Sequence, residues 1–277
     1  MVRVAGRAKK VRAEKIFILS LFLGIFLIAF VCITLGNMFY TQARDISALI
    51  EAAKDINVLE AIWISISAAF IATLIAFIFG TPLAYFLARK EFFGKSIIEG
   101  VVDVPLMIPH IVAGIAIYGV FMRHGIIGAP LNRIGIVFQD AFAGIVVAML
   151  FVSFPFFVNA AKEGFKDVDA RFERVARSLG ASQFRTFFEV TFPLASRSIL
   201  SGAIMCWGRA ISEFSAVLII ASFPRSAPVL IYERFTSFGL RYAVPVSVLL
   251  ISICLLIFII LRILSTKKLK KTEICEE

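Results

Sequence analysis

The chain has 277 residues, of which 60% are hydrophobic and only 17% are charged, and its net charge is +10. A soluble domain averages about 45–50% apolar and about 25% charged residues, so this composition excludes an ordinary soluble protein. The mean hydropathy of +0.93 and uncharged runs of up to 28 residues indicate an integral membrane protein, because about 20 apolar residues cross a bilayer as a helix.

The apolar runs predict an all-α membrane protein with six transmembrane helices, at about 16–36, 60–86, 99–121, 141–161, 199–221 and 244–264. The first run follows a basic arm, as the apolar region of a secretory signal peptide does. It stays uncharged from Ile16 to Ala43, however, which is far beyond the roughly 7–15 residues of such a region. We therefore interpret it as a retained membrane anchor.

The basic residues predict how these helices are oriented, because Lys and Arg near the ends of spans stay in the cytoplasm. Twenty-one of the 29 Lys and Arg residues lie in the N-terminal arm and in the segments 87–98, 161–198 and 262–277. Seven lie in the loops on the other side, and Arg209 lies inside a span. The count predicts that both termini are cytoplasmic, and it explains the net charge without a nucleic-acid partner.

The third predicted span contains the segment DVPLMIPH, with Pro105, Pro109 and His110. A proline frees a backbone carbonyl and bends a membrane helix. The pair indicates either a structural kink or a broken helix that faces a translocation pathway. His110 is likewise either a functional group inside the membrane or a neutral hydrogen-bonding group between helices.

Segment 161–198 has the pattern of two short helices joined at Gly180. Apolar residues of the first helix recur at the spacing of one helical face, at Phe172, Val175, Ala176 and Leu179. Gly180 is expected to end this helix in a left-handed conformation. Ser182 is expected to cap a second helix that repeats the same apolar spacing, at Phe184, Phe187, Phe188 and Thr191, before Pro193 and the return to the membrane.

Three roles suit such an amphipathic basic element. A DNA-binding helix-turn-helix is disfavoured, because both ends are held at the membrane within a short segment. The element could lie flat on anionic lipid. It could also dock its apolar side chains into a cleft on a cytoplasmic partner and transmit movement.

The fifth predicted span contains WGRAISEFSA, with Arg209 and Glu213 four residues apart. A charge at bilayer depth costs about 2.5–3.5 kcal/mol, so charged groups there face the bundle interior or water. The spacing places both side chains on one helical face. They are either a structural pair that locks the packing or a cationic station for an anionic substrate.

Other chemistry has little support in the sequence. The four cysteines, Cys32, Cys206, Cys254 and Cys275, show no metal-binding spacing, and no metal site is expected. The segment EFFGKS ends like a phosphate-binding loop, but Arg89 stands where that loop needs its first glycine. Energy from ATP would therefore have to come from a partner.

The order Gly180, Val190, Phe192-Pro193 resembles the EAA loop of permease subunits of ATP-binding-cassette (ABC) importers. Where that family has E-A-A, this chain has Arg174-Val175-Ala176, with Glu173 one position early. The segments DVPLMIPHIVAGIA, AMLFVSFPFFVNAAKEGF, WGRAISEFSAVLIIASFP and APVLIYERFTSFGLRYA are similar to the molybdate, tungstate and sulfate permease branch, and IPH and LIYERF most resemble archaeal-type tungstate/molybdate permeases.

The resemblance implies a type I importer permease in the cell membrane of a prokaryote. It implies an N-terminal arm, first helix and outer loop at 1–59, a permease domain at 60–264 with a coupling loop at 161–198, and a cytoplasmic tail at 265–277. The coupling positions carried over are Glu173, Ala176, Leu179, Gly180, Ala181, Ser182, Phe184, Phe187 and Pro193.

The implied partners are two ABC ATPase subunits, a second permease chain in a homodimer, an external substrate-binding protein and the lipid bilayer. ATP and Mg would be bound by the ATPase, so the permease is not an enzyme and has no cofactor of its own. The outer loop 222–243 would meet the binding protein. It carries an excess of positive charge, since it contains three arginines, Arg225, Arg234 and Arg241, and one acidic residue, Glu233.

The sequence thus predicts the permease of an oxyanion importer, with tungstate or molybdate as the substrate and sulfate or thiosulfate as the alternative. A different class also remains, a self-contained ion-coupled carrier or channel with Arg209, Glu213 and His110 as its relay. The helix-turn-helix favours the importer, because a carrier has no need to present such an element to the cytosol.

Overall fold

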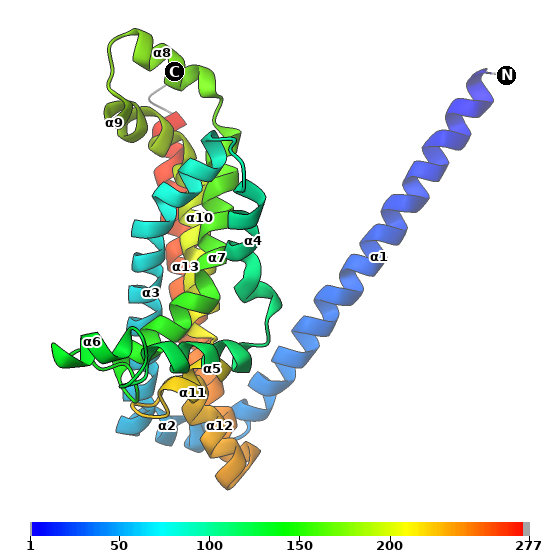
Figure 1. Ribbon diagram of the computed structural model, residues 1–277. Helices are drawn as coiled ribbons and strands as arrows, with labels where there is room; N and C mark the ends of the chain where they lie inside the picture. Colours follow the sequence, from blue (N-terminus) through cyan, green and yellow to red (C-terminus); the bar gives the residue numbers. More distant parts are fainter. Residues whose placement is uncertain (1, 274–277) are drawn as a thin grey trace. The chain divides into compact units, whose positions relative to one another are not determined.

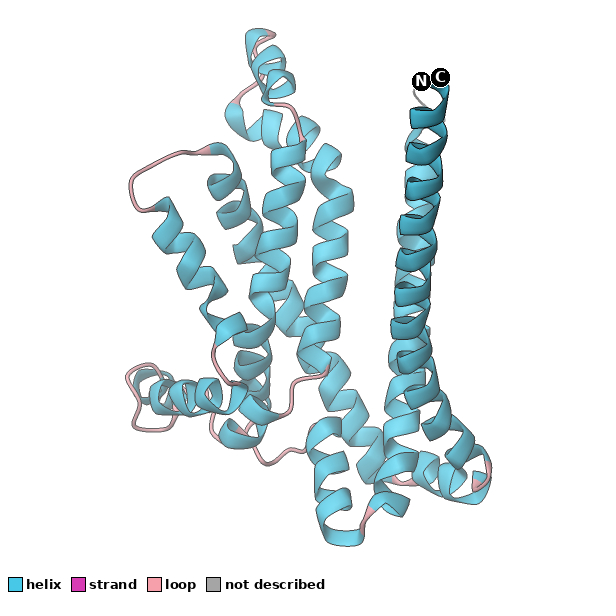
Figure 2. Ribbon diagram, turned by 90° about the vertical axis from the view of Figure 1, so that its right-hand side faces the viewer, coloured by secondary structure: helices cyan, strands magenta, loops and turns pink. Residues whose placement is uncertain are grey.

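The computed structural model describes residues 2–273, with side chains described for 17, 19–261 and 263 (Figure 1). In this part of the chain every regular element is a helix, as predicted, and there is no strand (Figure 2). The helices are α1 (Val2–Ala43), α2 (Ile46–Lys54), α3 (Ile56–Arg89), α4 (Lys95–Met107), α5 (His110–Phe121), α6 (Gly128–Arg133), α7 (Phe142–Asp167), α8 (Ala170–Ser178), α9 (Gln183–Thr186), the π-helix η1 (Phe187–Thr191), α10 (Phe192–Ile211), α11 (Ser215–Ile220), α12 (Ala227–Phe238) and α13 (Leu240–Glu273).

The chain divides after Ala52 into two compact units. The first consists of α1 and most of α2. The apolar window of α1, within Leu19–Ala43, has no buried side chain. A helix that is apolar on all sides and has no protein cover is suited to lipid or to the surface of another helix.

The second unit is built around α3, α7 and α10, which pack along one another. The face of α3 toward α7 consists of small residues, and Ala68, Ala69, Ala72 and Ala76 are all buried. Small side chains let membrane helices approach closely, and close approach is what stabilises their packing in lipid. Larger side chains of α7 then fill the space between the helices, namely Ile145, Met149, Val152, Phe157 and Phe165.

A close contact between α5 and α11 depends on a glycine. A Cβ at Gly114 would lie 2.8 Å from the Cα of Ala216, whereas a Cβ at Gly119 of the same helix would meet nothing within 4 Å. The obstacle at Gly114 is backbone, so it yields only if the helices separate.

We therefore expect Gly114→Val to destabilise the protein by about 1–3 kcal/mol or more, the cost of overpacking, and to lower its melting temperature in detergent. Gly119→Val is the matched control, because it places the same side chain in open space. Equal melting temperatures for the two variants would contradict the close α5–α11 contact.

Four described helices are long and apolar enough to cross a membrane, within Leu19–Ala43, Ile56–Arg89, Phe142–Asp167 and Leu240–Leu261. They correspond to the predicted spans at 16–36, 60–86, 141–161 and 244–264. The helices α1, α3 and α13 continue beyond both predicted ends and α7 beyond its C-terminal end, because helical hydrogen bonding does not stop where the apolar run stops.

The predicted span at 99–121 is wrong as a single helix. It consists of α4 and α5, whose axes are bent by 112° at Ile108 and Pro109. Pro109 lacks an N–H to continue the helix and favours an extended residue before it, and Ile108 is extended, with ψ 143°. Of the two interpretations of the proline pair, the structure shows a broken helix.

The predicted span at 199–221 is also wrong as a single helix. α10 begins earlier, at Phe192, and ends at Ile211, and α11 starts only at Ser215. This break and the α4–α5 break are near each other, because α5 packs against α11. Two interrupted helices thus meet at one place in the bundle.

Within the second unit, Figure 1 shows α8 and α9 at one end of the bundle and α5, α6, α11 and α12 at the other. The C-terminal ends of α3 and α13 lie at the α8–α9 end. The basic segments after α3 and around α8 are therefore at the same end, as the charge count predicts.

Candidate functional site

The α8–α9 element begins with a capped helix and turns at Gly180. Asp169 caps α8 by accepting from the Arg171 N–H at 2.8 Å. At the other end Gly180 has φ +92°, its N–H donates to the Arg177 carbonyl at 3.0 Å, and the Ala181 N–H donates to the Ala176 carbonyl at 3.0 Å. These two bonds form a Schellman motif, in which a glycine reverses the chain without a Cβ clash.

The second helix starts at Ser182 and joins the membrane helix without a break. The Ser182 hydroxyl oxygen accepts from the Arg185 N–H at 3.2 Å, as predicted for a cap. The chain then runs through α9 and η1 into α10. In η1 the Phe192 N–H donates to the Phe187 carbonyl, five residues back. Pro193 follows at once, and its missing N–H removes one bond of the ordinary α-helical ladder, which is compatible with a π-turn at this point.

The tip of this element is an exposed apolar surface. We define the coupling tip as Phe172, Val175, Leu179 and Phe184, which are all exposed; Leu179 and Phe184 are 82% and 74% exposed. α8 has no buried residue at all. Several large exposed apolar side chains on one short element are typical of an interaction surface.

The four residues after Ser182 that were predicted to share one helical face do not all point the same way. Phe184 and Phe188 are exposed, but Thr191 is buried and Phe187 is half-buried. The Phe187 ring lies 4.9 Å from the Tyr85 ring and 5.9 Å from the Phe165 ring, between centroids. Phe187 thus points into the bundle and contacts α3 and α7 rather than joining the coupling tip.

Glu173 connects the coupling tip to the membrane helices. Its Oε1 accepts from Arg89 Nε at 2.8 Å and from Thr191 Oγ1 at 3.0 Å, and its Oε2 accepts from Tyr85 Oη at 3.2 Å. The side chains of Glu173 and Arg89 are only 15% and 14% exposed. Arg89 also donates to the Val168 carbonyl at 2.9 Å.

This arrangement joins α8 to the end of α3 and to η1. A mostly buried carboxylate with three donors is a rigid joint, because losing any donor leaves a costly unpaired group. In the sequence Glu173 stands one position early relative to the family pattern, and nothing near it indicates the partners Arg89, Tyr85 and Thr191. No local signal identifies them, since Arg89 and Tyr85 lie more than 80 residues away in the chain.

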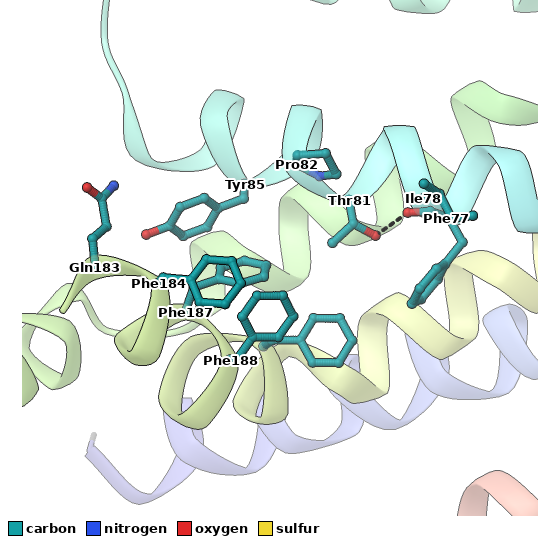
Figure 3. Close-up of a pocket in the computed structure, with 10 residues that line it drawn as sticks. Phe77, Ile78, Thr81, Pro82, Tyr85, Gln183, Phe184, Phe187 and Phe188 are labelled. Atoms are coloured by element: carbon teal, nitrogen blue, oxygen red, sulfur yellow. Dashed lines mark hydrogen bonds between the residues drawn. The ribbon is translucent and has the colours of Figure 1, made fainter. Parts of the chain in front are cut away.

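An apolar groove of about 670 Å³ lies beside this joint, between α3 and the α9–η1–α10 helix. In Figure 3 Tyr85, Pro82 and Thr81 of α3 are on one side, and Phe184, Phe187 and Phe188 are on the other. Phe184 therefore belongs both to the coupling tip and to the lining of this groove.

A second polar group lies at the place where the two broken helices meet. Arg209 Nη2 donates to Glu213 Oε2 at 2.7 Å and lies 2.9 Å and 3.0 Å from the two ring nitrogens of His110. His110 Nδ1 lies 3.3 Å from the same Glu213 oxygen. Glu213 Oε1 accepts from the Ala216 N–H at 3.0 Å. The structure therefore brings together three residues that the sequence placed in two separate spans.

The prolines near this group have different positions. Pro105 is buried within α4, and Pro109 precedes the first residue of α5. Pro109 thereby places His110 at the start of α5, where it faces the end of α10.

The outer segment 222–243 is less positive than its composition predicts. Arg225 pairs with Glu233 at 2.5 Å, and Arg234 pairs with Asp55 at 2.5 Å, which the sequence did not anticipate. Burial alone would raise the pKa of Asp55, but hydrogen bonds from the Asn57 N–H and from Arg234, with the Arg234 charge, hold that pKa below its ordinary value of 3.8. The excess charge predicted for this segment is therefore partly neutralised.

Comparisons with known proteins agree with this architecture. Residues 80–270 match the family described as "Binding-protein-dependent transport system inner membrane component". The chain is 47% identical to the molybdate/tungstate transport system permease protein of Thermococcus kodakarensis, over 89% of this chain and 94% of that protein. It is also 47% identical to the protein of the same name from Pyrococcus furiosus, over 87% and 91%. A probable sulfate transport system permease protein of Chlorokybus atmophyticus is 34% identical, over 80% and 84%.

Solved structures show the same fold at low identity. A bacterial ABC transporter involved in the import of alginate matches with a TM-score of 0.65 and 14% identity, over 80% of this chain and 83% of that one. An inward-facing methionine ABC transporter matches with a TM-score of 0.58 and 14% identity, over 77% and 95%. The chain belongs to the binding-protein-dependent transport system inner membrane components, in the branch of the molybdate/tungstate transport permeases.

Proposed function

We propose that this chain is the membrane-spanning permease of an ATP-driven importer for molybdate or tungstate. The names and the 45–47% identity of the archaeal relatives support the substrate class. The observation that carries the mechanism is the coupling tip, an exposed apolar surface whose base is joined by Glu173 to a membrane helix. A tip of this kind suits docking in a groove of an ATPase subunit.

The proposed topology has six crossings with both termini in the cytoplasm. Four helices are long apolar spans, and the broken pairs α4–α5 and α10–α11 would complete the set. The basic segments 87–98 and 161–198 lie at the same end as the coupling tip, which supports a cytoplasmic assignment for that end.

The proposed assembly has two permease chains as a homodimer, two ATPase subunits and an external substrate-binding protein, in the cell membrane of a prokaryote. The ATPase would supply ATP and Mg binding, since the Gly-Lys-Ser segment at 94–96 lacks the first glycine of a phosphate-binding loop. The binding protein would dock at the end opposite α8, where α6, α11 and α12 lie.

Reconstitution tests the function directly. The permease is placed in liposomes with its cognate ATPase and binding protein, and uptake of labelled molybdate, tungstate and sulfate is measured with and without ATP. We expect ATP-dependent uptake of molybdate and tungstate, with sulfate transported at least about tenfold more slowly. Preferential sulfate uptake would reassign the substrate, and uptake without ATP or the ATPase would favour a self-contained carrier.

A further inference from the structure

The group formed by Arg209, Glu213 and His110 has more partners than a structural ion pair needs. Arg209 and Glu213 already cancel each other's charge at 2.7 Å, and the Ala216 N–H completes the shell of Glu213. His110, from a different broken helix, adds a further contact to both. Buried ion pairs contribute little net stability relative to apolar residues of the same size, so stability alone does not account for this arrangement.

The three side chains are arranged in order of exposure. Glu213 is 1% exposed, Arg209 is 19% exposed and His110 is 37% exposed. His110 lines an open hollow of about 560 Å³ together with Met107, Ile108, Pro109, Ile111 and Ser215. Of the three, His110 lines the hollow, Arg209 contacts His110 from behind, and Glu213 is the most buried.

The polar groups at the hollow can donate hydrogen bonds, which is what an anion requires. Apart from His110 and Ser215, its lining side chains are apolar. A tetrahedral oxyanion carries only acceptor atoms, and a guanidinium presents several donors to such oxygens. An anion entering the hollow would meet His110 first, and the Arg209 guanidinium lies next to it, with Nη2 2.9 Å from His110 Nδ1.

The position in the fold suits a transit site. The group lies where both interrupted helices break, and α5 and α11 are at the end of the bundle away from the coupling tip (Figure 1). Interrupted membrane helices are tolerated where they are buried in protein or line a cavity, and transporters place substrate sites at such breaks. Transport also needs weak binding, because a site must release what it takes up.

We infer that Arg209 and His110 form a transit station for the transported oxyanion, and that Glu213 is a built-in competitor that holds the two donors when the station is empty. The bound anion would accept the hydrogen bonds that Arg209 and His110 otherwise donate to Glu213. When the anion leaves, Glu213 would accept these hydrogen bonds again. This inference rests on the proposed function, since it names the groups that touch the substrate of that importer.

The test uses the complete reconstituted importer and the double variant Arg209→Gln/Glu213→Gln. The double replacement removes both charges together, so neither Arg209 nor Glu213 leaves an unpaired buried charge behind. We expect assembly with the ATPase, and ATP hydrolysis stimulated by the loaded binding protein within about twofold of the wild type. We expect molybdate uptake to fall at least tenfold, so that at least ten times more ATP is hydrolysed per anion transported.

The ion pair of Lys162 and Glu99 provides the matched control, because it joins α7 and α4 at 3.2 Å and does not line the hollow. Uptake by Lys162→Gln/Glu99→Gln should stay within about twofold of the wild type. The single variant His110→Gln should lower uptake three- to tenfold, because an amide replaces the ring at the mouth of the station.

Three results would overturn the station. Normal uptake by the Arg209→Gln/Glu213→Gln variant shows that the charges do not contact the substrate. Failure of that variant to assemble assigns the group to folding. An equal loss of uptake in the Lys162→Gln/Glu99→Gln control shows a general effect of removing ion pairs.

The wild type separates this inference from the proposed function. If the wild-type importer transports sulfate but not molybdate, the proposed substrate is wrong, and the station is tested by the same comparison with sulfate. If the wild-type complex transports no oxyanion, both are wrong.

Discussion

Replacing Phe184 by Asp should prevent the permease from assembling with its ATPase. Phe184 is 74% exposed on the coupling tip, so the replacement leaves the fold of the bundle unchanged. Docking would bury the ring, and the loss of a central aromatic anchor costs about 2 kcal/mol or more, or roughly 30-fold in affinity. A carboxylate at position 184 would also have to lose its water when the tip enters the groove of the ATPase, which adds a desolvation cost. We therefore expect no stable complex in co-purification and no ATPase stimulation.

The control is Phe93→Asp, because Phe93 is fully exposed and lies in the loop between α3 and α4, but it is not part of the coupling tip. Its complex should form normally. Gly180→Pro should resemble Phe184→Asp, because proline cannot adopt φ +92° and lacks the N–H that donates to the Arg177 carbonyl. Normal ATPase binding by both Phe184→Asp and Gly180→Pro would contradict the assignment of the coupling tip.

Replacing Glu173 by Gln should separate ATPase binding from transport. The amide removes the counter-charge of Arg89, a partner that is only 14% exposed, and breaking such a pair costs about 3 kcal/mol or more. The coupling tip itself is unchanged, so the ATPase should still bind. Movement of the tip would no longer be transmitted rigidly to α3, and we expect less anion transported per ATP, with a lower melting temperature.

The ion pair of Glu163 and Lys166 supplies the comparison for this variant. It lies near the same end, at the end of α7, but its side chains are 61% and 41% exposed. Exposed pairs contribute only about 0–1 kcal/mol, so Glu163→Gln should change neither stability nor coupling. The proposed role of Glu173 fails if Glu173→Gln transports as many anions per ATP as Glu163→Gln.

Several features of the α8–α9 element depend only on neighbouring residues and are therefore predictable from the sequence. The apolar spacing before Leu179, the reversal at Gly180 and the cap at Ser182 each depend on residues within one or two helical turns. Local hydrogen bonds and backbone sterics decide such features, and a single sequence contains all the information they need.

The orientation of Phe187 could not be predicted by the same reasoning. Its spacing from Phe184 suggests a shared exposed face, but the packing of α9 and η1 against α3 directs Phe187 toward Tyr85, and η1 then shifts the register of the residues that follow. A π-turn leaves no periodic signal in the sequence, and Pro193 alone does not specify it. The break between α10 and α11 was not predicted, because hydropathy measures how apolar a segment is and not where its axis bends, whereas the proline pair indicated a broken helix at α4–α5 as one of two alternatives.

The apolar runs and the helix-glycine-helix pattern sufficed to indicate a membrane permease and its α8–α9 element, because burial in lipid and helix capping act over short stretches of chain. Which residues meet across the bundle was decided only by the packing of the helices. Glu173 contacts Arg89 across 84 positions, and His110 contacts Arg209 across 99. Neither contact follows from local preference, because a charged group inside a bundle pairs with whatever partner the surrounding helices bring within reach.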